Sequence, residues 1–309
     1  MTVLWLLLAC GGDPAPTPST PTGPCAVAEV GAWRAVFRAG ELCGESGDLH
    51  AALETARGLE ASDRLVFLDG VGHGLGPPEG DGQGLIDALA TLPPNERRML
   101  HNGVIRAYTQ AHVDQPAQVE AWATDYAARA GGDVNPEEGA RVGLQRALGA
   151  DPVAARRAAL TFPEAWWPAL FEELGWQAGD AVDLARSHPQ ALGVAVPEVA
   201  RCVFFQGAAR GATMRAAVDG RLQPPTAFIQ RLSPACQRAA WRGVGFAVTI
   251  TLRSDPAAAE AALAGIEDAA GQAEARAVWD HNHRRVLPEG EVPLLLWSPP
   301  QEVPPPEGR

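Results

Sequence analysis

The sequence contains no lysine, so all 25 of its basic residues are arginine. A Walker A loop needs a lysine on the bound phosphates, and Schiff-base and serine–lysine catalysis need one as the reacting amine. The sequence therefore excludes these three kinds of site. Its 37 acidic residues give a net charge of −12, and no basic stripe runs through them. This charge pattern argues against nucleic acid as a partner.

Aromatic residues make up only 6% of the 309 residues, while alanine and leucine are abundant. This bias favours helices over strands. Apolar residues amount to 46%, enough for a packed core. Within the chain, the apolar runs fall short of the roughly 18 residues that a membrane span needs. Motifs for zinc proteases, serine hydrolases and dinucleotide binding are missing, and so is the close cysteine spacing of zinc sites. We therefore expect no cofactor and no metal.

The N-terminus carries an apolar run over residues 2–9, which is too short to span a bilayer and is typical of a secretory signal. Directly after it, Leu7-Leu8-Ala9-Cys10 followed by glycine resembles the lipobox of bacterial lipoproteins. The resemblance implies cleavage before Cys10, so that residues 1–9 are the signal peptide and Cys10 carries the lipid. The missing basic residue before the run departs from that pattern. The alternative is a chance apolar N-terminus with a free cysteine.

Residues 10–24 follow as a proline- and threonine-rich tether, with five prolines between residues 13 and 24. Such a segment favours polyproline geometry at about 3.1 Å per residue and would hold a domain off a membrane. The helical repeat domain is expected over residues 25–286. A proline-rich tail, 287–309, closes the chain, and we expect Leu294 to Trp297 to pack on the domain.

A glycine followed after three residues by glycine or alanine recurs along the chain at steps of 33, 36, 36, 32 and 36 residues. A fixed period of this size indicates a repeat architecture. Each glycine in a helix costs about 1 kcal/mol relative to alanine, so six at one phase indicate close helix packing. The sequence predicts an all-α, α-solenoid-like stack of about six to seven antiparallel helix pairs with small-xxx-small packing. The frame glycines are Gly70, Gly103, Gly139, Gly175, Gly207 and Gly243.

The repeat pattern is similar to that of a few uncharacterised bacterial families whose helices repeat G-x-G-x-A, and this resemblance implies no activity. The alanine-rich stretch 256–277 is expected to form a helical cap on the stack.

Four cysteines remain besides Cys10, namely Cys25, Cys43, Cys202 and Cys236. An even number in an exported protein suggests disulfides, and three pairings are possible. Proximity favours Cys25–Cys43 and Cys202–Cys236, of which the second would join adjacent repeats. The alternative is four buried free thiols.

His73 is the histidine with the most chemical potential, because Asp69 lies four residues earlier on the same expected helix. That spacing would let the carboxylate orient the imidazole, which is half of a general-base arrangement. The alternative is a histidine packed between repeats. Arg106 and Arg210 occupy the same position of the frame as His73. They form either a basic ladder that binds an anion or ion pairs with acids of neighbouring helices.

These observations favour a non-enzymatic binding or scaffold module that is anchored to a bacterial membrane, on its periplasmic or cell-surface side, and presents its surface to an envelope protein or peptide. One alternative is a hydrolase-type enzyme that uses His73 and Asp69. Another is a small-molecule or glycan binder, for which Trp166, Trp167 and Trp241 would supply the aromatic platform instead of packing in the core.

Overall fold

The computed structural model describes residues 23–27, 33–78, 80–131, 134–218, 222–252 and 255–283. Within these ranges the chain is 74% helical, with fifteen α-helices, one 3₁₀ turn and no strand. The predicted all-α helical stack is confirmed. The signal segment, Cys10, most of the tether and the proline-rich tail lie outside the described residues.

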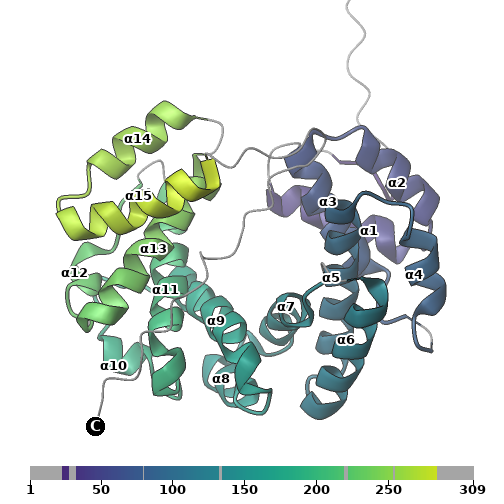
Figure 1. Cartoon of the computed structure of the whole chain (residues 1–309), viewed down its shortest axis with the longest axis horizontal. Helices are drawn as coiled ribbons and strands as arrows, with labels where there is room; N and C mark the ends of the chain where they lie inside the picture. The colour runs from purple at the N-terminus through teal and green to yellow at the C-terminus, as the bar shows by residue number, and fades with distance from the viewer. Residues whose placement is uncertain are drawn as a thin grey trace, which may run out of the picture.

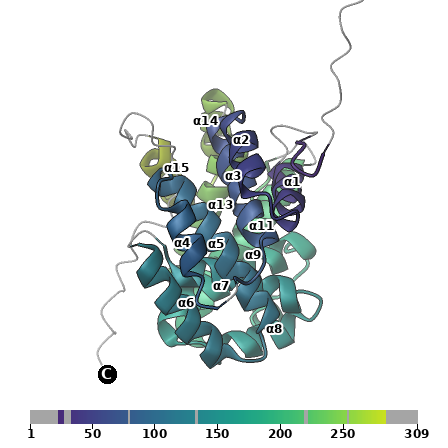
Figure 2. The same cartoon turned by 90° about the vertical axis from the view of Figure 1, so that its right-hand side faces the viewer.

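Inner helices alternate along the chain with outer helices, most of which are shorter (Figure 1). The inner helices follow an arch with α1 and α15 at its two ends, and the outer helices lie around its periphery; Figure 2 shows the arch from its side. After α1 the described chain thus holds seven outer–inner pairs. The inner helices are α1 (Trp33–Glu45), α3 (Ala61–Gly74), α5 (Pro94–Ala111), α7 (Pro136–Leu148), α9 (Trp167–Ala181), α11 (Glu198–Val218), α13 (Pro234–Thr251) and α15 (Ala269–His283).

The outer helices are α2 (Leu49–Arg57), α4 (Gln83–Leu89), α6 (Pro116–Ala130), α8 (Pro152–Ala159), α10 (Pro189–Leu192), α12 (Thr226–Ile229) and α14 (Pro256–Ala264). A single 3₁₀ turn, Glu164–Trp166, leads into α9.

Proline and aspartate decide where most helices begin. Eight helices carry proline in their first two positions, where its missing N–H costs nothing and its fixed φ suits a helix. Asp48, Asp151 and Asp255 cap α2, α8 and α14 by accepting hydrogen bonds from backbone N–H groups. The alanine-rich stretch 256–277 is two helices, because Gly265 ends α14 and Asp268 accepts from the N–H of Gly271 at the start of α15.

Neighbouring inner helices run parallel and approach so closely that their backbones touch. A Cβ built on Gly207 of α11 would strike the carbonyl oxygen of Glu172 on α9, and a Cβ on Gly175 of α9 would strike the carbonyl oxygen of Phe204 on α11. One helical turn later, Gly179 and Gly211 repeat the reciprocal contact, which fixes the parallel direction. Because consecutive inner helices are parallel, the outer segment between them must return the chain.

The same reciprocal geometry holds for three further pairs of described glycines, which makes five pairs with the two above. In each pair, a Cβ on either member would meet the carbonyl oxygen of the residue three before the other member, closer than the 3.0 Å that real Cβ atoms respect. Only glycine leaves room for such a contact between two helix backbones. The pairs are Gly40 with Gly70, Gly44 with Gly74, Gly72 with Gly103, Gly175 with Gly207, and Gly179 with Gly211.

The frame glycines do not all face the same neighbour. Gly70, Gly103, Gly139, Gly207 and Gly243 each face the preceding inner helix, whereas Gly175 faces the following one. No described glycine of α7 faces α9, and no described glycine of α9 faces α7. The step from α7 to α9 is therefore the one at which the glycine packing stops.

Two hydrophobic clusters fill the interior. One joins α1, α2, α3, α4 and α5, and the other runs from α4 and α5 to α15. Two disulfides reinforce the stack: Cys25–Cys43 ties the segment before α1 to that helix, and Cys202–Cys236 joins α11 to α13. These are the two pairings that proximity favours, and the second joins adjacent repeats.

Candidate functional site

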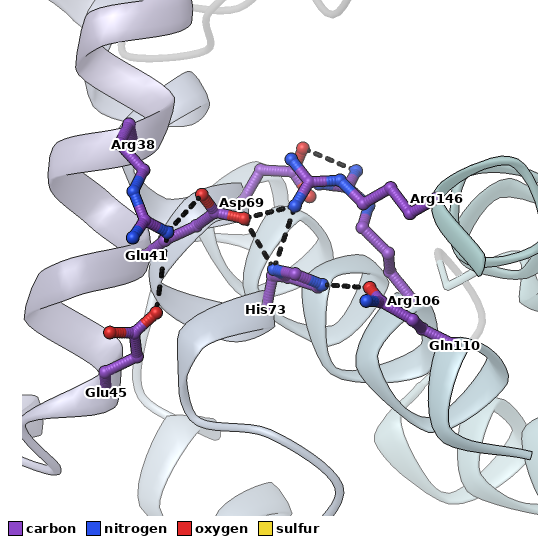
Figure 3. Close-up of polar contacts among 8 residues, drawn as sticks. All are labelled: Arg38, Glu41, Glu45, Asp69, His73, Arg106, Gln110 and Arg146. Carbon is purple, nitrogen blue, oxygen red and sulfur yellow. Dashed lines mark hydrogen bonds and ion pairs between the residues drawn. The ribbon is translucent and has the colours of Figure 1, made fainter. Parts of the chain in front are cut away.

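The C-terminal turns of α1, α3, α5 and α7 converge on His73 (Figure 3). Five side chains form what we call the His73 cluster: Arg38 and Glu41 from α1, His73 from α3, Gln110 from α5 and Arg146 from α7. Cations are favoured at helix C-termini because the exposed carbonyl groups there carry partial negative charge. The placement of His73 and Arg146 follows this rule.

Glu41 is the centre of the cluster. Its Oε1 lies 2.7 Å from Nδ1 of His73 and accepts from Nη1 of Arg146, while its Oε2 accepts from Nη1 of Arg38 at 3.0 Å. The contact of Arg146 with Glu41 connects α7 to α1, although the two residues are 105 positions apart in the sequence. The carboxylate thus holds together the neighbouring helices α1 and α3 and, beyond α5, helix α7.

Both ring nitrogens of His73 are engaged. Nδ1 faces Glu41, and Nε2 lies 2.9 Å from Oε1 of Gln110. The ring donates to both oxygens only when it carries two protons. A neutral ring donates either from Nδ1 to Glu41 or from Nε2 to Gln110, and in the second case Nδ1 faces Nη1 of Arg146 at 3.4 Å. In either state the imidazole is tied between α1 and α5.

The environment of Glu41 favours its ionised form. Burial by itself would raise the pKa of this carboxyl, since only 6% of its side chain is exposed. The hydrogen bonds from His73 and Arg38 and the charge of Arg146 outweigh burial and lower the pKa to about 2. Glu41 is therefore a permanent anion near neutral pH.

Asp69 does not serve the role that the sequence suggested. Its Oδ2 accepts from Nη2 of Arg106 at 2.7 Å, so the acid that meets His73 is Glu41, from a different helix. The backbone places Asp69 one turn before His73. The close contact between α3 and α5 at Gly72, however, places Arg106 beside the carboxylate of Asp69. The guanidinium groups of Arg106 and Arg146 both lie over the ring of Phe37, at 5.0 and 4.8 Å from its centroid.

A second buried polar group, the Glu172 cluster, lies where the glycine packing stops. It comprises Arg141 of α7, Glu172 and Glu173 of α9, and Arg210 of α11. Arg210 donates to Glu172 at 3.0 Å, and Arg141 lies 3.4 Å from Glu173. Burial raises the pKa of Glu172 and lowers that of Arg141, each opposed by the charge of the other sign nearby. Charge pairing takes the place of glycine at this step.

Comparison with known protein families, curated proteins and solved structures found no match to this chain. Its function must therefore be inferred from the geometry of its own residues.

The other candidates from the sequence have structural surroundings. Arg106 and Arg210 each pair with an acid of a neighbouring helix and do not form a ladder. Trp166 and Trp241 are buried, with 7% and 2% of their surface exposed, so neither offers a sugar an open face. Trp167 is partly buried and donates to the carbonyl of Phe162.

Two features are absent from the described part of the chain. It contains no group of three metal-ligating side chains, and none of its helices combines the length and the apolarity that crossing a bilayer requires.

Sequence reasoning singled out only His73 among the five cluster members and missed Arg38, Glu41, Gln110 and Arg146. A signal existed for Glu41 and for Arg146. Gly40 and Gly44 carry the glycine frame in α1, one repeat before the first copy that the periodicity identified, and Glu41 lies directly after Gly40. Arg146 lies three residues after Gly143, as His73 does after Gly70.

Proposed function

We propose that the chain is a non-enzymatic scaffold or binding module of a bacterial envelope, anchored through Cys10 and presenting its rigid stack to a protein partner. The observation that supports this most is charge balance. In and around the His73 cluster, Arg38, Arg106 and Arg146 face Glu41, Glu45 and Asp69. In the Glu172 cluster, Arg141 and Arg210 face Glu172 and Glu173.

Charges that cancel within the protein leave none to bind a charged substrate or to stabilise a charged transition state. An enzyme site keeps an unpaired acid, base or donor directed at the reacting atoms. Here the polar side chains at equivalent positions of the repeats join one helix to the next, which is the chemistry of a scaffold.

The disulfides and the N-terminal sequence support the proposed location at the envelope. The two disulfides indicate an oxidising, exported environment. The lipobox resemblance and the tether add a membrane anchor to this proposal. Cys10→Ser is then expected to move the protein from the membrane fraction to the soluble fraction, whereas a protein that stays with the membrane would contradict the anchor.

The outer surface offers a place for a partner to bind. Among the described residues, five large hydrophobic side chains are exposed. Two of them lie on α8 or directly after it, and two lie between α10 and the first turn of α11. Arg156 of α8 connects the two segments by donating to the carbonyl of Val194 at 3.0 Å. These four side chains are Val153, Leu160, Val194 and Val199, and the fifth is Leu42 on α1.

Three single substitutions separate a scaffold from an enzyme. In cells that lack the gene, we expect His73→Gln to restore the function and Val199→Asp to abolish it, because Val199 is 79% exposed and its loss leaves the fold intact. Leu42→Asp is the matched control on a distant helix, and it should restore the function. Circular dichroism verifies that each variant is folded. If His73→Gln does not restore the function and Val199→Asp does restore it, the proposal is overturned in favour of the enzyme alternative.

A further inference from the structure

Five aromatic rings from α5, from its C-cap His112 and from α6 form a continuous column. Tyr108 stacks on Trp122 with ring centroids 3.8 Å apart and planes 8° apart, and Trp122 stacks on Tyr126 at 4.7 Å and 15°. His112 stacks on the outer face of Tyr108 at 4.3 Å, and His101 meets Tyr126 edge-on. The column contains both tyrosines of the chain.

The two tyrosines differ in what their hydroxyl groups meet. The hydroxyl of Tyr126 lies 2.8 Å from Nδ1 of His101, and both residues are fully buried. The hydroxyl of Tyr108 instead accepts a hydrogen bond from Nε2 of Gln118 at 2.9 Å. An imidazole can take the proton of its partner phenol, whereas the NH₂ of an amide cannot. Only Tyr126 therefore has a base within hydrogen-bond distance.

His101 is in the neutral state that a proton acceptor needs. Burial and the charge of Arg97 lower the pKa of His101 to about 4, so the ring is neutral at pH 7. Its Nε2 is buried without a hydrogen-bond partner among the described residues. A neutral ring that accepts from Tyr126 carries its hydrogen on this Nε2, and Nδ1 is left free to accept a proton.

We propose that this column is a one-electron donor site, in which Tyr126 is oxidised through Trp122 while its proton moves to His101. An oxidised transition-metal complex at the protein surface takes one electron from Trp122, which is only partly buried. Tyr126 returns an electron to Trp122 across the stacked rings. Its O–H bond breaks as an N–H bond forms at Nδ1 of His101. The oxidant is reduced by one electron, and the products are a neutral tyrosyl radical and an imidazolium.

The test oxidises the full chain with photogenerated tris(bipyridine)ruthenium(III) and records the trapped radical by electron paramagnetic resonance. We expect a tyrosyl signal in the wild type and in Tyr108→Phe, and its loss in Tyr126→Phe. Each substitution removes one hydroxyl and keeps the ring in the stack. Trp122→Phe should also lose the signal, because phenylalanine is much harder to oxidise. A signal that survives Tyr126→Phe, or that disappears in Tyr108→Phe, would overturn the assignment.

The proton transfer needs its own measurement. His101→Phe should replace the tyrosyl signal with that of a tryptophan radical, provided that circular dichroism shows a folded variant. In the wild type, formation of the tyrosyl radical should be slower in D₂O than in H₂O. Equal rates in the two solvents would refute the transfer of the proton to His101, whatever the fate of the variant.

Discussion

Replacing Gly207 by alanine adds one methyl group at the closest contact between α9 and α11. The new Cβ would overlap the carbonyl oxygen of Glu172, a backbone atom that cannot turn aside as a side chain would. The two helices must therefore separate. Since Gly175 makes the reciprocal contact, the separation loosens packing on both sides of the pair.

The magnitude follows from two opposing terms. Alanine is favoured over glycine inside a helix by about 1 kcal/mol. Overpacking in a close-packed interior costs about 1–3 kcal/mol, and two rigid backbones in contact belong at the upper end of that range. The expected net effect of Gly207→Ala is a loss of about 2 kcal/mol in the free energy of unfolding.

Gly84 of α4 provides the matched control, because a Cβ there would meet no atom within 4 Å. Gly84→Ala should stabilise the protein by up to about 1 kcal/mol. Urea unfolding followed by circular dichroism compares the two variants with the wild type. The double variant Gly175→Ala/Gly207→Ala should lose less than the sum of the single losses, because the first substitution already separates the helices. If Gly207→Ala is as stabilising as Gly84→Ala, the close-contact interpretation is wrong.

Three further predictions concern charges and the cross-link. Glu41→Gln should lower the free energy of unfolding by up to about 3 kcal/mol at pH 7. The difference from wild type should shrink as the pH falls from 4.5 toward 2, because Glu41 of the wild type then becomes protonated in the folded state. A loss that is independent of pH in urea unfolding would contradict this. Cys202→Ser/Cys236→Ser should lose about 4 kcal/mol in the free energy of unfolding for a separation of 34 residues, and reduced wild-type protein, which also loses Cys25–Cys43, should lose at least as much. Equal urea midpoints for the wild type and the variant would contradict this. Arg210→Met should lose about 3 kcal/mol in the free energy of unfolding at pH 8, because it leaves Glu172 without its ion-pair partner. Burial already raises the pKa of Glu172, so the loss should shrink as the pH is lowered and this carboxyl takes up a proton. A loss that is the same at every pH would exclude Glu172 as the cause.

The repeat architecture could be predicted from the sequence because its cause is local and periodic. Glycine at a fixed phase costs helix stability, so its recurrence shows that something packs against each position. Periodicity does not show which neighbour does so. Gly175 faces forward while Gly207 faces back, and that choice depends on the backbone geometry at the step from α7 to α9.

The candidate site could be predicted only in part, because a spacing of four residues describes one helix and the site is made by four. Asp69 and His73 are neighbours along α3, yet each finds its closest partner on another helix, Arg106 and Glu41 respectively. Partners that lie 32 to 37 residues away, or 105 in the case of Arg146 and Glu41, become neighbours only after the stack has formed.

The reciprocal glycine pairs constrain how this sequence can change over generations. A substitution at Gly175 that forces α9 and α11 apart removes the reason for glycine at Gly207, where alanine would then be preferred for helix stability. Each pair is thus expected to be inherited or lost as a unit. In related chains the two positions should covary, and such paired changes would reveal which helices touch even where the rest of the sequence has diverged.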